Sequence, residues 1–187
     1  MAQPGTVIEN PVLGMKIRFL QTGRASGGHM LKLEYWVRPG GAREMVAHFH
    51  PRIAERFEIK AGQGEYRVGK EIKPARAGDD LTLPAGVPHI HPWNTGSEDL
   101  HFIQTVTTPK PMVEALERVE RVFEFLARLA QEGKTNAQSL PRNPLQMAMV
   151  VQALQPETYL VGLPVPAQQV LLGGMAWMGQ RMGYKLG

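Results

Sequence analysis

The sequence predicts a mainly β fold, a sandwich or barrel in residues 6–107, followed by an α-helical extension. Short β-prone runs recur through the first part and are separated by turns that contain glycine and proline. After Thr108-Pro109-Lys110-Pro111, apolar residues instead recur at three- and four-residue steps, which is typical of helices. The 187-residue chain, 43% hydrophobic, can bury one sizeable core. We therefore expect a β domain in residues 1–108 and a helical extension in residues 109–187.

The expected strands are short and end at recognisable turns. Gly62-Gln63-Gly64 and Pro84-Ala85-Gly86 are examples of such turns. The strand that begins at Glu55 alternates clearly, with Glu55, Phe57 and Ile59 on one face and charged residues on the other. The candidate strands cover residues 15–21, 30–37, 43–50, 55–60, 65–68, 81–83, 88–92 and 99–107.

The extension is expected to contain three helices. The first has Pro111 in its first turn and runs to about Gly133. Its apolar side chains form one stripe that consists of Met112, Leu116, Val119, Phe123 and Leu126. Asn143 precedes the second helix, which covers residues 144–154. The third follows Pro164-Val165-Pro166 and runs to about Tyr184, with an interruption at Gly173-Gly174.

Five of the six histidines lie between positions 48 and 101, which indicates one functional site. Residues two apart on a strand point to the same face, so His48 and His50 can present both imidazoles to one point. Pro51 should end that strand and allow Glu55 to return on the next one. A carboxylate on a buried face is costly unless it is paired or bound to a metal. The pattern therefore predicts a metal site to which His48, His50 and Glu55 contribute.

A second histidine pair follows later in the chain. His89 and His91 come after the turn at Pro84-Ala85-Gly86 and are again two apart, so they can share a face. Imidazoles together with a carboxylate suit one divalent transition metal, namely Fe, Mn, Ni, Cu, Co or Zn. No thiolate is available, because the chain has no cysteine. His29, in an expected turn, and His101, in an alternating strand, are expected to be structural.

These two segments resemble the paired motifs of the cupin superfamily. Gly41 through Gly62 is similar to the first motif, and Gly78 through His89 is similar to the second. The resemblance covers roughly residues 30–106 and implies a double-stranded β-helix, or jelly-roll barrel, with the metal inside its mouth. It also implies one metal per chain, held by His48, His50, Glu55 and His89.

The chain departs from the motifs at two positions. Gly41 lies one residue further from His48 than is usual, and the asparagine that closes the second motif comes one place late, as Asn94. Neither residue is an expected ligand. His91 is an additional histidine, and we interpret it as a wall residue or a neighbour of the metal ligands.

A fold does not determine chemistry, so the function has to be inferred from the site. Four protein ligands on a metal that prefers five or six leave one or two positions open for substrate, water or dioxygen. Glu55 is also the candidate catalytic carboxylate. The expected substrate pocket is mainly apolar and is lined by Phe57, Ile59, Leu83, His91, Phe102 and Gln104, with Tyr35 or Trp36 and Ile103 as alternatives where the strand phase is ambiguous.

The leading functional hypothesis is a mononuclear metal-dependent oxygenase of the quercetinase-like type. It would act on a small, partly aromatic organic substrate, and it rests on the ligand set and on analogy with cupins. The enzymatic alternative is a metal-dependent isomerase, decarboxylase or lyase. The non-enzymatic alternative is a cupin that binds a small ligand without turnover.

Composition narrows the expected partners and location. The formal charge is only +4 and no basic run is present, so nucleic-acid binding is not expected. The first residues lack the features of a signal peptide, and no apolar run reaches the ~18 residues of a membrane-spanning helix, so a cytoplasmic location is expected. The resemblance implies a homodimer. We expect the methionine-containing helices of the extension to pack on the barrel or across this dimer. The alternatives are contact of Arg181 and Lys185 with a membrane surface, a substrate lid, or a surface for an unknown partner.

Overall fold

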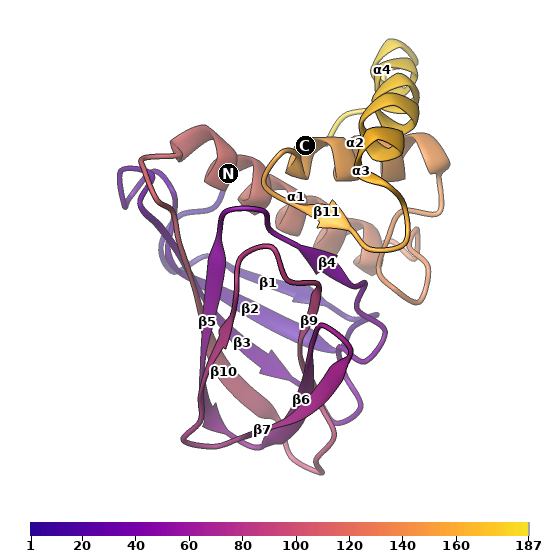
Figure 1. The fold of residues 1–187 in the computed structure, drawn as a ribbon. Helices are drawn as coiled ribbons and strands as arrows, with labels where there is room; N and C mark the ends of the chain where they lie inside the picture. The colour runs from indigo at the N-terminus through magenta and orange to yellow at the C-terminus, as the bar shows by residue number, and fades with distance from the viewer. Residues whose placement is uncertain (187) are drawn as a thin grey trace.

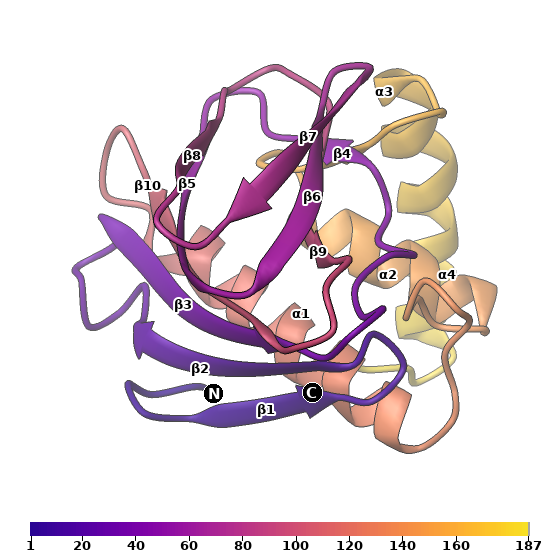
Figure 2. The ribbon, with the colours of Figure 1, turned by 90° about the horizontal axis from the view of Figure 1, so that it is seen from below.

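The computed structural model describes residues 1–186, which form two antiparallel sheets that face each other and a group of helices at one end (Figures 1 and 2). The first sheet contains β1 Val7–Asn10, β2 Met15–Gln21, β3 Met30–Val37, β5 Ala54–Ala61, β8 Asp80–Leu83 and β10 Leu100–Thr107. The second contains β4 His48–Phe49, β6 Gln63–Val68, β7 Glu71–Arg76, β9 His89–Asn94 and β11 Tyr159–Leu160. Their strand orders are β1-β2-β3-β10-β5-β8 and β11-β4-β9-β6-β7. The predicted mainly β jelly-roll fold with C-terminal helices is confirmed.

Most expected strands are present, with one substantial correction. The expected strand over residues 43–50 is reduced to His48–Phe49. Just before it the chain turns, since Met45 N donates to Ala42 O at 3.2 Å and Ala42 has a positive φ of 61°. Backbone groups that close a turn are not available to pair with a neighbouring strand. His50 therefore lies just beyond the end of β4.

Three strands lie outside the expected set. β1 and β7 are edge strands, and their exposed side chains lack a clear apolar alternation. β7 also contains Pro74, a residue that sheets accept at an edge. β11 belongs to the extension and pairs with β4, so that Leu160 lies opposite His48. The extension thus adds a strand to the second sheet.

The main core lies between the two sheets. The alternation expected for β5 is observed, since Glu55, Phe57 and Ile59 are buried and Arg56 is exposed. Leu116 from the first helix joins the same hydrophobic cluster. The barrel core is therefore continuous with the extension at the end of the sandwich that the helices cover.

The helical segments are α1 Val113–Gln131, α2 Pro144–Leu154, the short α3 Val165–Ala167, the π-helical turn η1 Gln168–Leu172 and α4 Gly173–Arg181. The side chain of Asn143 caps α2 by accepting from the backbone N–H groups of Leu145 and Gln146. The expected interruption at Gly173-Gly174 is wrong, because helical structure continues from α3 to the end of α4. Gly173 keeps an ordinary helical φ of −61°, and the irregular π turn comes before it.

Helix α1 crosses the open end of the sandwich and is anchored to the loop between β2 and β3. Met112 N donates to Gly28 O at 2.9 Å, and Gly23 N donates to Glu120 Oε1 at 2.6 Å. Gly28 has a φ of +85°, and a Cβ atom there would lie 2.6 Å from Met112 N. Only glycine permits this close approach, which sets where α1 begins.

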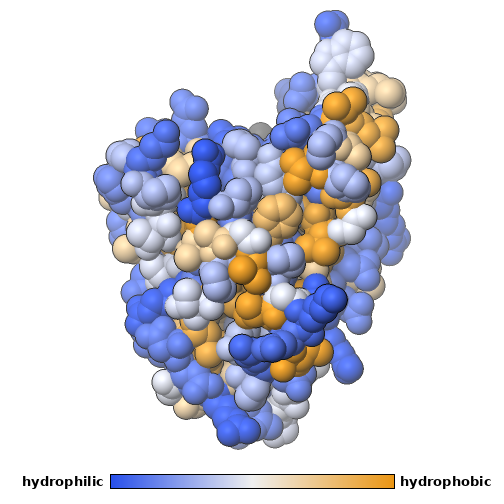
Figure 3. Space-filling model, viewed as in Figure 1, coloured by the Kyte–Doolittle hydropathy of each residue, from blue (hydrophilic) through white to orange (hydrophobic). Residues whose placement is uncertain are grey.

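The outer face of the last helical segment exposes large apolar side chains. Five of them are between 47% and 78% exposed, namely Val170, Leu171, Trp177, Met178 and Met182. Figure 3 shows apolar surface on this side of the molecule. The opposite face packs on α2, where Met149 and Ala176 belong to a separate small core. Within residues 1–186, no helix is long and apolar enough to cross a membrane.

Candidate metal centre

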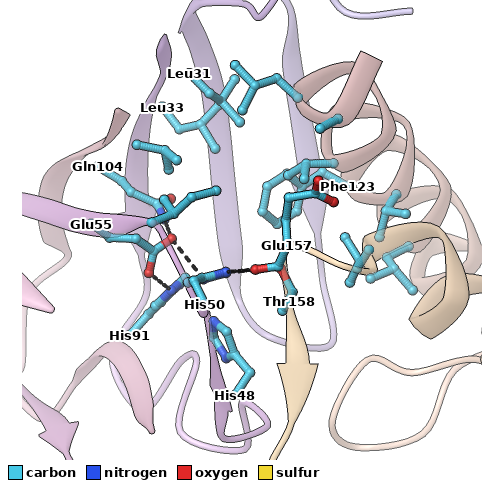
Figure 4. Close-up of a pocket in the computed structure, with 18 of the residues that line it drawn as sticks. Leu31, Leu33, His48, His50, Glu55, His91, Gln104, Phe123, Glu157 and Thr158 are labelled. Atoms are coloured by element: carbon cyan, nitrogen blue, oxygen red, sulfur yellow. Dashed lines mark hydrogen bonds and ion pairs between the residues drawn. The ribbon is translucent and has the colours of Figure 1, made fainter. Parts of the chain in front are cut away.

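Four histidines and one glutamate from facing sheets meet inside the mouth of the barrel. Figure 4 shows four of these five residues, namely His48, His50, Glu55 and His91. β4 and β9 of the second sheet carry His48, His89 and His91, and His48 lies directly opposite His89 in their ladder. Glu55 comes from β5 of the first sheet, and His50 follows β4. The closure of the two sheets over each other therefore brings the two sequence clusters together.

The donor atoms of this group are close enough to share one ion. One ligand atom from each of the five residues lies within 4.8 Å of the others. The Nε2 atom of His50 is 3.4 Å from Glu55 Oε1, and the Nε2 atom of His89 is 3.2 Å from Glu55 Oε2. The ring centroids of His48 and His89 are 4.6 Å apart.

The backbone orients three of the imidazoles in the same way. The Nδ1 atoms of three histidines lie 2.9–3.0 Å from backbone carbonyl oxygens, in the pairs His48–Val46, His50–Glu157 and His89–Val87. Because a carbonyl oxygen only accepts, each Nδ1 carries the hydrogen and each Nε2 presents its lone pair. The Nε2 atoms of His50 and His89 are buried without a hydrogen-bond partner. A divalent cation fits this donor set, since it would satisfy both atoms.

His91 differs from the other three histidines. Its Nε2 lies 2.7 Å from Glu55 Oε2, which makes it a hydrogen-bond partner of the carboxylate. Gln104 Nε2 donates to the other oxygen, Glu55 Oε1, at 2.7 Å, and Tyr35 donates its hydroxyl hydrogen to Gln104 Oε1 at 2.7 Å. Both oxygens of Glu55 are thus held by side chains of the barrel interior.

The electrostatics of the group favour metal binding. Burial by itself raises the pKa of Glu55, but the neighbouring imidazoles, His91 foremost, outweigh it and hold this pKa well below its usual value. Burial lowers the pKa of His48 well below its usual value and also lowers the pKa of His91. Burial likewise disfavours the charged form of His50, but Glu55 outweighs it and raises that pKa. The ionised carboxylate of Glu55 and the neutral imidazole of His48 are in the protonation states that metal ligands require, whereas a metal at His50 would compete with the proton that its raised pKa favours.

The extension contributes to the centre in a way that the sequence did not indicate. Thr158, which directly precedes β11, places its Oγ1 at 3.0 Å from His50 Nδ1, next to the carbonyl of Glu157. These contacts join positions more than one hundred residues apart. No local pattern around residues 155–160 predicts them, because they depend on the pairing of β11 with β4.

The expected pocket residues fall into two groups. His91 and Gln104 border a cavity next to the centre, and Tyr35 does so too. Four others, namely Phe57, Ile59, Leu83 and Phe102, lie in the packed core and do not border this cavity. The side chains that replace them come from β3 and α1, for example Leu31, Leu33 and Phe123 (Figure 4).

The two remaining histidines lie away from the centre. His29 is exposed in the turn between β2 and β3. His101 stacks on Trp36 with ring centroids 5.1 Å apart, and its Nε2 is 2.8 Å from Glu34 Oε1. Neither histidine belongs to the group of five residues that could share a metal ion.

Comparison with known proteins identifies a family that this chain matches. Residues 34–106 match the family model described as "Cupin domain". A search of curated proteins found no match. Similar solved structures include a predicted oxalate decarboxylase from Thermotoga maritima, with 20% identity, coverage of 55% of this chain and 99% of that chain, and a TM-score of 0.47. An oxalate oxidase has 17% identity, coverage of 60% and 61%, and a TM-score of 0.46.

A third similar structure is the nucleoside dehydratase Pac13 of Streptomyces. It has 16% identity, coverage of 58% of this chain and 79% of that chain, and a TM-score of 0.44. Likenesses at these levels carry no information on the reaction of this chain.

Proposed function

The chain belongs to the cupin superfamily through its residues 34–106, and on this basis we propose a metal-dependent enzyme whose ligands are His48, His50, Glu55 and His89. One observation carries the proposal. Three imidazoles have their Nδ1 atoms held by backbone carbonyls, so that their Nε2 lone pairs are available beside one buried carboxylate. One divalent transition metal per chain, Fe, Mn, Ni, Cu, Co or Zn, suits this mixed nitrogen and oxygen set.

When bound, the metal supplies Lewis-acid or redox chemistry at the polar end of the cavity. The protein's own residues keep that end ordered. His91 and Gln104 hold the two oxygens of Glu55, so the carboxylate cannot rotate freely. Burial, and then the charge of Glu55, raise the pKa of Tyr35 well above its usual value, so Tyr35 keeps its proton and continues to donate to Gln104.

The reaction that we propose is a quercetinase-like oxygenation of a small, partly aromatic organic substrate. Dioxygen is the second substrate, and both of its atoms enter the product, so no external reductant is needed. A cavity of about 180 Å³ with mainly apolar walls supports this proposal, because such walls favour an organic ring over a strongly polar ligand.

Metal analysis tests the ligand set. Protein purified without added metal should contain about one divalent ion per chain by inductively coupled plasma mass spectrometry. The double variant His48→Ala/His50→Ala should lose this metal, because two of four ligands are gone, and the matched variant His29→Ala should retain it. Full occupancy in the double variant would refute the assignment.

Oxygen uptake tests the reaction class. Iron-, nickel- and copper-loaded protein should consume oxygen with at least one member of a panel of catechols and flavonols. No uptake with any of these metals would count against an oxygenase and favour an isomerase, decarboxylase or lyase. Tight ligand binding without product over hours would favour a cupin that only binds its ligand.

We also propose that the protein is a homodimer in the cytoplasm. The exposed apolar side chains between Val170 and Met182 support a second copy as the partner, since such patches mark association sites. Sedimentation equilibrium should give the dimer mass, and Leu171→Glu should reduce it to the monomer mass. Binding to anionic vesicles by a monomer would instead favour the membrane-surface alternative, in which Arg181 and Lys185 face phosphates.

A further inference from the structure

The cavity beside the metal centre is formed jointly by the barrel and the extension (Figure 4). Leu31 and Leu33 of β3 border it from the barrel side. Leu116, Val119 and Phe123 of α1 border it from the helical side. The barrel alone would leave the mouth open, so the extension turns an open mouth into a chamber.

Most polar groups that line the chamber belong to the metal centre or are hydrogen-bonded to its residues, and the carboxylate of Glu157, which lies toward α1, is already paired. Gln104 bonds to Glu55 and Tyr35, and the carboxylate of Glu157 pairs with Arg118 at 3.2 Å. Among the described residues that line the chamber there is no lysine or arginine. A hydroxyl or charge placed against the apolar walls would lose its water without gaining a partner.

The size of the chamber limits the ligand further. Its volume is about 180 Å³, and an apolar protein cavity of about 150 Å³ accommodates benzene. One ring with a short apolar substituent therefore fills it. Three fused or linked rings exceed this space, and a very small dianion would leave the apolar part unfilled.

We propose that the ligand of this chamber is a single-ring apolar molecule with its oxygen substituents at one end. The ring and its apolar substituent lie against α1, and the oxygen end faces the metal centre. The claim that the oxygen end of this ligand binds a metal depends on the proposed function. The claim that its body is apolar depends on the chamber alone. Within a quercetinase-like reaction class, the substrate is then a monocyclic compound such as an alkylcatechol, and a flavonol is excluded by size and polarity.

Binding measurements with defined probes separate the two parts of the inference. Ethylbenzene should bind both metal-free and metal-loaded protein, because it needs only the chamber. 4-Ethylcatechol should bind the metal-loaded protein at least tenfold more tightly than the metal-free protein. Quercetin and oxalate should bind the loaded protein at least tenfold more weakly than 4-ethylcatechol. Isothermal titration calorimetry gives all of these affinities.

Two variants of α1 test the chamber directly. Val119→Trp should fill it and weaken ethylbenzene binding at least tenfold without loss of metal, whereas Glu114→Trp, on the exposed part of the same helix, should leave binding unchanged. If Val119→Trp does not fold, Phe123→Ala provides a second test, because the enlarged chamber should newly bind naphthalene.

The outcomes distinguish the chamber from the proposed function. Absence of ethylbenzene binding to wild-type protein, or quercetin binding as tight as that of 4-ethylcatechol, would overturn the inference. Ethylbenzene binding that Val119→Trp abolishes, in protein that never retains metal, would support the chamber and overturn the proposed metal-dependent function.

Discussion

Thr158→Val should weaken metal binding although Thr158 is not a proposed ligand. The hydrogen on His50 Nδ1 is shared between the carbonyl oxygen of Glu157 and the hydroxyl oxygen of Thr158, each at 3.0 Å. Loss of the partner that orients a metal-bound histidine typically costs about 10–100-fold in metal affinity. The carbonyl remains in the variant, so we expect the lower end of this range, about tenfold, or about 1.4 kcal/mol.

Competition with a chelator of known affinity measures this effect. Thr82→Val is the matched control, because Thr82 is exposed on β8 and the exchange has the same size. The thermal midpoint of the metal-free proteins shows whether Thr158→Val also disturbs the fold. If Thr158→Val binds metal as tightly as Thr82→Val does, then the extension does not orient His50 and this reasoning is wrong.

Two further predictions concern the interior. His91→Ala should retain most of the metal, because His91 contacts the Glu55 carboxylate, whereas His89→Ala should lose it; the reverse result by metal analysis would show that the ligand assignment is displaced by two residues. Burial raises the pKa of Glu120 in the folded protein. The contribution of Glu120 to the free energy of unfolding is therefore present at acidic pH and is lost as the pH rises through that pKa. Glu120→Gln keeps an acceptor for Gly23 N–H and should raise the thermal midpoint by a few degrees at pH 7, with a smaller difference near pH 4; an equal difference at both pH values would contradict this account.

Local periodicity predicted several elements well. β2 and β3 have the expected bounds, and α2 begins at the expected cap. Such elements are recognisable because their side-chain repeat is set by the backbone geometry of the element itself. The prediction of a strand over residues 43–50 was wrong because Met45 and Ala42 close a turn there, and a side-chain repeat does not reveal such a backbone hydrogen bond.

The sequence by itself determined the type of site. The His48/His50 spacing, the return of Glu55 on a buried face and the His89/His91 pair predicted a mixed nitrogen and oxygen cluster, and all five residues do meet. It also predicted the apolar stripe of α1, because that stripe depends only on the helical repeat.

The tertiary structure alone decided what surrounds these residues. The apolar stripe of α1 faces the mouth of the barrel rather than its outer surface, and it lines the chamber. Phe57 and Phe102, which were expected to line it, are instead packed in the core. Thr158 reaches His50 only because β11 pairs with β4. Contacts between distant segments depend on which surfaces pack together, and no local repeat encodes that choice; this is why the sequence predicts the donor atoms, whereas the shape of the chamber follows only from the fold.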